Sequence, residues 1–202
     1  MIKARRFAWL LPILSASPAY AHAPVAGIEG FYIGLLHPFS TPSQAALMFG
    51  AALVVGGFGV EKARWQLGTF LVVSFAGLFL GSAASDLDAT MFAVAFAGCA
   101  LAALFPGKMA PAAIALAAVG GFLIGSASIP DDGPARDRLF IMSGSMIGAN
   151  VGLLYLFGVI NVIRERYTWA WVSIAFRVAA AWLGAISLLM LALAFVDTPT
   201  PA

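Results

Sequence analysis

The sequence predicts an all-α, polytopic membrane protein with six transmembrane helices after a cleavable signal peptide. Its 202 residues are 62% hydrophobic and only 10% charged, whereas a soluble domain carries roughly 25% charged residues. The mean hydropathy of +0.97 points to the same class. The net charge of +2 is small and dispersed, so it does not indicate binding to nucleic acid. The lipid bilayer is therefore the expected surrounding of this chain.

Residues 1–21 have the three parts of a secretory signal. Basic residues come first, and the apolar stretch "FAWLLPIL" that follows is too short to span a bilayer. Ala19 and Ala21 then form an A-x-A cleavage pattern. Cleavage after Ala21 would make His22 the first residue of a single domain, 22–202. The alternative is an uncleaved membrane anchor.

Six long apolar segments follow, and each approaches or exceeds the length of about 17–25 residues that a transmembrane helix needs. A further apolar stretch, 28–37, is too short to cross alone. It either extends the first span or forms a half-inserted segment. The six predicted spans are 43–60, 65–84, 89–105, 109–129, 139–160 and 169–196.

The distribution of basic residues predicts the orientation of these spans. A cleaved signal leaves the mature N-terminus outside, and six spans return the C-terminus to the same side. The outside loops at 85–88 and 130–138 hold two arginines and five aspartates. Cytoplasmic loops favour Lys and Arg, and the inside loops hold five: Lys62, Arg64, Lys108, Arg164 and Arg166.

The stretch "TPSQ" at 41–44 predicts the start of a helix. Thr41 suits the N-cap, Pro42 suits the first helical position, and Gln44 completes an S/T-x-x-E/Q capping box. His37, four residues earlier, is then a lone histidine. Such a residue is more typical of a hydrogen-bonded structural role than of a metal ligand.

Few polar residues lie at membrane depth, where they are costly and therefore informative. Arg177 either reaches the cytoplasmic interface or pairs with a carboxylate or with carbonyl groups at a helix end. Asn150 is expected to form a hydrogen bond between helices, with a cavity-lining role as the alternative. Gln66 lies near a membrane edge and is expected to contact water. The sequence holds no Ser-His-Asp set, no paired intramembrane carboxylates and no phosphate loop, so we do not expect an enzyme.

Glycines are spaced for close packing of helices. Gly77 and Gly81 form one GxxxG motif, and Gly144, Gly148 and Gly152 form two in series. Small residues allow helix backbones to approach each other in lipid. The expected use is contact within one bundle, and the alternative is contact with other subunits of a membrane complex.

These residues together resemble the HupE/UreJ family of bacterial inner-membrane proteins. His37 and Pro38 match the start of the family motif HPxxGxDH, while Thr41, Ser43 and Gln44 stand where glycine, aspartate and the second histidine are usual. The resemblance implies a cleaved signal, about six spans and an association with nickel or cobalt uptake. The signal and the basic residues together predict that both mature termini lie in the periplasm.

Two further stretches keep the framework of the family and lack its histidines. "LIGSASI" at 123–129 stands in place of a stretch like FHGHAHG, with Ile124, Ser126 and Ser128 at the histidine positions. "LLYLFG" at 153–158 has Tyr155 in place of a histidine, whereas Arg177 and the small residues after it are retained. Since nickel and cobalt prefer imidazole and carboxylate ligands, the pattern indicates an ion site that was abandoned or re-specified.

Two functions remain open from the sequence. The first is a metal permease or metal-handling protein, for nickel, cobalt or copper. In that case His22 with its free α-amine suits copper, and the other contributors would be His37, Met48, Asn150 and Tyr155. The second is a non-catalytic structural or accessory subunit of a larger membrane complex.

Overall fold

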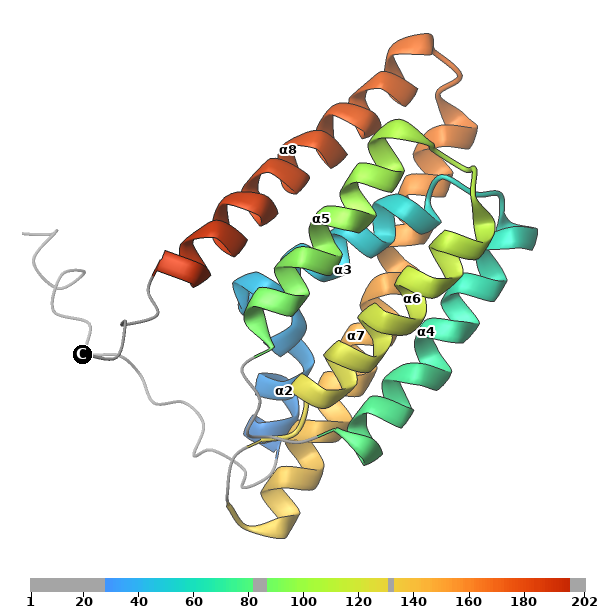
Figure 1. Ribbon diagram of the computed structural model, residues 1–202. Coiled ribbons are helices and arrows are strands. Elements are labelled where there is room, and N and C mark those ends of the chain that lie inside the picture. Colours follow the sequence, from blue (N-terminus) through green and yellow to red (C-terminus); the bar gives the residue numbers. More distant parts are fainter. Residues whose placement is uncertain (1–27, 82–86, 131–132, 197–202) are drawn as a thin grey trace, which may run out of the picture.

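The computed structural model describes residues 28–81, 87–130 and 133–196 (Figure 1). Within these ranges every regular element is a helix, which confirms the predicted all-α class. The predicted signal peptide and His22 lie outside the described residues. The helices are α2 (Ile28–Ser40), α3 (Pro42–Val55), α4 (Val60–Leu80), α5 (Asp88–Leu104), α6 (Ala110–Ala127), α7 (Ala135–Arg166) and α8 (Ala170–Val196).

Four of these helices, α4, α6, α7 and α8, are long and apolar enough to cross a membrane by length and composition. The protein is therefore membrane-embedded. The other two predicted spans correspond to α3 and α5, which are apolar but only 14 and 17 residues long. A 14-residue helix extends only about 21 Å, which is less than the roughly 30 Å of the hydrocarbon core. The count of six spans thus stays a prediction.

Proline causes the break between α2 and α3. A residue that precedes proline is pushed out of the α region, because the proline ring collides with its backbone and Cβ. Thr41 precedes Pro42 and adopts an extended conformation, with φ −90° and ψ 121°. The first apolar region is therefore two helices joined at one residue, and 28–37 belongs to the first of them.

The glycine face of α7 packs against α2. A Cβ added at Gly144, Gly148 or Gly152 would meet Phe31, Leu35 or Phe39 respectively, all of them on α2. Successive contacts are four residues apart on both helices and follow the same order along the chain, so α2 and α7 run in the same direction. These three glycines are therefore used for contact within the bundle, which is the expected use.

The second predicted glycine motif is also used inside the chain. A Cβ at Gly77 of α4 would collide with the backbone of Phe122, and one at Gly81 would collide with Ser126. From the other side, Gly121 and Gly125 of α6 approach the α4 backbone around Phe70 and Ser74. The two helices therefore pack with their backbones in close contact, side by side as Figure 1 shows.

The loops with predicted cytoplasmic charges meet at one end of the bundle. Gly57 in the α3–α4 loop lies against Gly107 in the α5–α6 loop, where φ of +68° favours glycine. Arg164, near the end of α7, reaches the carbonyl group of Gly56 in the same region.

Three exposed aromatic rings lie next to one another around the start of α8, as an interfacial aromatic belt requires. They belong to Tyr167, Trp169 and Trp171.

Candidate functional site

His37 lies in the last turn of α2 and is partly buried. Its backbone carbonyl accepts hydrogen bonds from Thr41 and Ser40, whereas its imidazole forms none within the described residues. In those residues no three or more His, Cys, Asp or Glu side chains gather as metal ligands would. The structure therefore does not surround His37 with the donors that the resemblance implies.

The predicted capping box at 41–44 is wrong. Thr41 occupies the N-cap and Pro42 the first turn, as expected, but the Thr41 side chain makes no capping hydrogen bond. The Thr41 amide donates instead to the carbonyl of His37. Gln44 is only 3% exposed, and its Oε1 has no hydrogen-bond partner. The reason is geometric, because α2 runs directly into α3 and supplies the acceptor for the Thr41 amide.

Asp88 takes the place of a capping side chain near the start of α3. The Ser43 hydroxyl donates to Asp88 Oδ1 over 2.6 Å, and Ser43 is only 1% exposed. Asp88 is also the first residue of α5. Its carboxylate therefore lies near the N-termini of two helices, where the positive ends of both dipoles stabilise negative charge. Sequence reasoning placed Asp88 in an outside loop and missed this contact.

Ser126 and Ser128, at two histidine positions of the family, join helices instead. Ser126 donates to the carbonyl of Gly77 on α4 over 3.3 Å. Ser128 donates its single proton to the carbonyl of Ile124 and lies 2.8 Å from the Ser145 hydroxyl of α7. Since the Ser128 proton is already used, Ser145 must be the donor of that bond. Ser126 of α6 and Ser128, the C-cap of α6, are thus both satisfied by protein groups.

Asn150 forms the hydrogen bond between helices that the sequence suggests. Its Nδ2 donates to Ser74 Oγ of α4 over 3.2 Å and to the carbonyl of Met146 over 2.9 Å. Ser74 donates its own proton to the carbonyl of Leu71, so it accepts from Asn150.

The expectation that Gln66 contacts water is wrong, because Gln66 is fully buried at 0% exposure.

Tyr155 is separate from these contacts. Its side chain is 70% exposed on the outside of α7, so it does not line an interior route. Met48 is at 0% exposure and belongs to the apolar core, as does Leu153. The structure therefore does not assemble the polar route for which His37, Met48, Asn150 and Tyr155 are the candidates.

Two arginines bind carbonyl groups at the ends of the shorter helices. Arg177 Nε donates to the carbonyl of Ala103, in the last turn of α5, over 2.7 Å. Arg164 Nη1 donates to the carbonyl of Gly56, the C-cap of α3, over the same distance. Arg177 thus takes the helix-end alternative, and Arg164 is a second arginine of this kind that sequence reasoning missed. Cations at C-termini complement the helix dipole.

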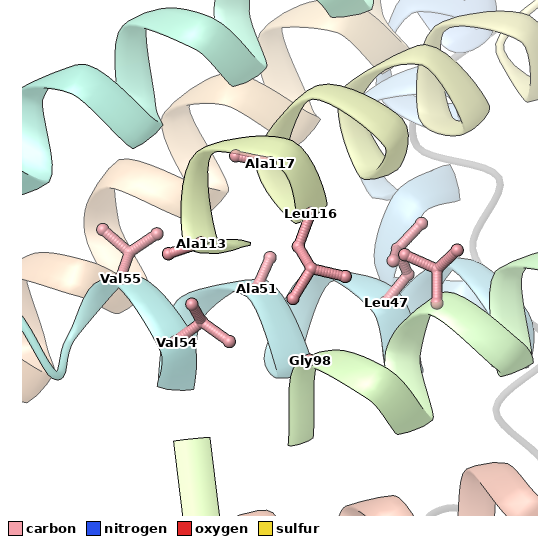
Figure 2. Close-up of a pocket in the computed structure, with 9 residues that line it drawn as sticks. Leu47, Ala51, Val54, Val55, Gly98, Ala113, Leu116 and Ala117 are labelled. Carbon is pink, nitrogen blue, oxygen red and sulfur yellow. The ribbon is translucent and has the colours of Figure 1, made fainter. Parts of the chain in front are cut away.

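The part of the core between α3, α5 and α6 is apolar and closely packed. Figure 2 shows a small cavity between α3, α5 and α6, with aliphatic side chains and a glycine around it. Its volume is about 10 Å³, which is about the space of one water molecule. It is lined by Leu47, Ala51, Val54, Val55, Val94, Gly98, Ala113, Leu116 and Ala117.

At three of the positions where the resemblance expects metal ligands, those of Ser43, Ser126 and Ser128, the structure thus has hydroxyl groups that connect helices. Hydroxyl groups in this arrangement stabilise the contacts between α3 and α5, α4 and α6, and α6 and α7. No family model matches the chain, and neither a curated protein nor a solved structure matches it significantly.

Proposed function

We propose that this chain is a divergent protein of the HupE/UreJ type that acts as a non-catalytic accessory subunit in the bacterial inner membrane. In this proposal it does not carry nickel or cobalt. Both mature termini face the periplasm, and the five basic residues of the inside loops face the cytoplasm. The α3–α4 and α5–α6 loops meet at one end of the bundle, which supports the placement of both on the same side of the membrane.

The use of Ser43, Ser126 and Ser128 carries the proposal. Each of them stands at a position where the resemblance expects a carboxylate or imidazole ligand, and each donates its proton to a protein acceptor. A divalent nickel or cobalt ion needs several imidazole or carboxylate groups that converge. The serines instead supply contacts between helices, which is what a structural component of a membrane assembly requires.

The packing of the interior also supports an accessory role. Ion passage requires a polar route through the bundle, with groups that replace the water around the ion. Ser74 and Asn150 are already paired with each other, and the core around Met48 and Leu153 is apolar. The cavity between α3, α5 and α6 adds no polar lining side chain.

The test combines uptake with native mass. Cells that express the full chain are expected to take up radioactive nickel and cobalt no faster than cells with an empty vector. After extraction in a mild detergent, the 21.0 kDa chain is expected to migrate in a heavier assembly with a stoichiometric second protein. Nickel uptake above background, or a chain that migrates only alone, would contradict the proposal.

Metal analysis of the same preparation tests the remaining alternative. Stoichiometric copper that disappears in a His22→Ala variant would favour a metal-handling protein that uses the N-terminal amine and imidazole. If the chain is an accessory subunit, the unchanged protein and the His22→Ala variant are expected to have the same metal content.

A further inference from the structure

A groove between α4 and α7 opens toward the membrane near the middle of both helices. Its volume is about 260 Å³. Phe70 and Leu153, each 1% exposed, form its base, and Leu71, Val151 and Leu154 are largely exposed at its edges. The eight lining residues are Leu67, Gly68, Phe70 and Leu71 of α4 with Asn150, Val151, Leu153 and Leu154 of α7.

Gly68 keeps the groove open. A Cβ added at Gly68 would meet no atom within 4 Å, unlike the glycines that hold α4 against α6. This glycine is therefore not needed for contact between the described helices. A larger side chain at the same place would extend into the space of the groove.

Asn150 is the one polar side chain among the lining residues of this groove. Both protons of its amide group are used, one by Ser74 Oγ and one by the carbonyl of Met146. Because Ser74 donates to Leu71, the nitrogen rather than the oxygen of Asn150 must face Ser74. The remaining polar atom is Oδ1, which accepts no hydrogen bond within the described residues.

An unpaired amide oxygen at this depth is costly, because the hydrocarbon core contains no water that could donate to it. Acyl chains can fill the apolar part of the groove, but they have no donor. A ligand that satisfies the site combines an apolar body with one hydroxyl group. An engineered cavity of 150 Å³ holds a benzene molecule, so the groove has room for one substituted aromatic ring beside Phe70.

We propose that the groove between α4 and α7 binds a lipid-soluble hydroquinone, whose phenolic hydroxyl donates to Asn150 Oδ1 and whose ring lies over Phe70 and Leu153. A phenol donates more strongly than an aliphatic alcohol and carries the flat ring that the groove accommodates. The oxidised quinone has only acceptors, so it faces Asn150 Oδ1 without a hydrogen bond. The test of this binding site is separate from that of the accessory role proposed above, because it measures hydroquinone binding and neither metal uptake nor assembly.

The test compares three probes on the full chain in nanodiscs of phosphatidylcholine, under nitrogen. They are decyl-benzohydroquinone, the corresponding quinone, and the dimethyl ether of the hydroquinone. Saturable binding of the hydroquinone is expected, about threefold to tenfold tighter than that of the other two, which is the worth of one net hydrogen bond. Equal binding of the hydroquinone and the ether would overturn the proposal.

Two variants locate the site. Gly68→Leu fills the groove and is expected to abolish binding, whereas the matched control Gly158→Leu is expected to retain it, since Gly158 on α7 also has open space around it. Asn150→Leu is expected to bind hydroquinone and ether equally. Hydroquinone binding that survives in Gly68→Leu would overturn the proposed location.

A fourth probe tests the commitment to a phenol. Dioctanoylglycerol carries a free aliphatic hydroxyl and no ring, so it is expected to displace the hydroquinone poorly. Displacement with equal affinity would show that the groove recognises any lipid with a hydroxyl group, and would overturn the assignment. The comparisons among the four probes use the unchanged chain, so they do not depend on whether a variant folds.

Discussion

The hydroxyl of Ser43 on α3 donates to the carboxylate of Asp88 on α5, and the two residues lie 45 positions apart in the sequence. Ser43 stands where the HupE/UreJ motif has an aspartate. The carboxylate near the start of α3 thus comes from α5 in this protein. The contact joins the N-terminal ends of two parallel helices.

This contact should contribute to stability. We expect Ser43→Ala to lower the free energy of unfolding by about 1.5–3 kcal/mol, because a hydrogen bond to a charged group is lost at a buried serine. Thermal unfolding in detergent measures the effect. A double-mutant cycle with Asp88→Asn should give a coupling of about 1 kcal/mol. Additive effects would show that the bond contributes nothing, and Ser143→Ala, at an exposed serine bonded within its own helix, is the control.

Replacement of Thr41 by alanine is expected to change the stability by less than about 0.5 kcal/mol. An N-cap serine or threonine that bonds the helix start contributes about 0.5–2 kcal/mol, but the Thr41 side chain makes no such bond. Chemical denaturation of the unchanged protein and of the Thr41→Ala variant measures the difference in their free energies of unfolding. A loss above 1 kcal/mol would mean that the capping box forms after all.

Gly148→Ala is expected to destabilise the bundle by about 1–3 kcal/mol, the usual cost of overpacking. The added Cβ would collide with the backbone carbonyl of Leu35, which cannot rotate away as a side chain can. Gly158→Ala on the same helix is the matched control, since the space around Gly158 is open. Equal melting temperatures for the two variants would contradict the packing of α2 on α7.

Arg164→Gln is expected to lower the stability by about 1–3 kcal/mol, because the carbonyl of Gly56 loses a charged donor. Arg177→Gln should have a smaller effect, since Arg177 is exposed whereas Arg164 is partly buried. Chemical unfolding of both single variants and of the double variant measures these losses in the free energy of unfolding. The larger loss in Arg177→Gln would reverse the order that the burial of the two arginines predicts.

The orientation predicts the accessibility of the α5–α6 loop. A cysteine at Lys108, in a chain whose Cys99 is replaced by alanine, should react with a membrane-impermeant thiol reagent only after the cells are opened. Cys99 is fully buried in α5, so its replacement removes background labelling and no exposed group. Labelling of the Lys108→Cys protein in intact cells would invert the predicted topology.

The all-α class and the approximate helix positions could be predicted from the sequence, because apolar runs in a membrane protein report helices directly. The hydrogen bond of Asn150 between helices was also predictable, since an amide at that depth needs a partner. The start of α3 at Pro42 was predicted from Thr41 and Pro42, and the structure confirms it. The sequence left open whether 28–37 extends the first span, and the structure places it in a helix of its own, α2.

The roles of Asp88 and Arg164 could not be predicted, because each depends on which helices become neighbours. Asp88 and Arg164 lie in segments that the sequence assigns to loops, where charged residues contact water. The fold instead brings Asp88 to Ser43 and Arg164 to Gly56, each pair far apart in the chain. Gln66 was misplaced for the same reason, because its burial comes from helix packing and leaves no mark in its own segment.

The packing of α2 on α7 also constrains how the protein is made. Phe31 and Gly144 lie more than 100 residues apart, so a chain that grows at roughly 5–20 residues per second produces α7 about 5–20 s after α2. During that interval α2 has no glycine face on which to pack. Because it is only 13 residues long, it is also too short to span the bilayer alone. The docking of the earliest described helix on α7 is therefore a late step of assembly, which follows the synthesis of α3 to α6.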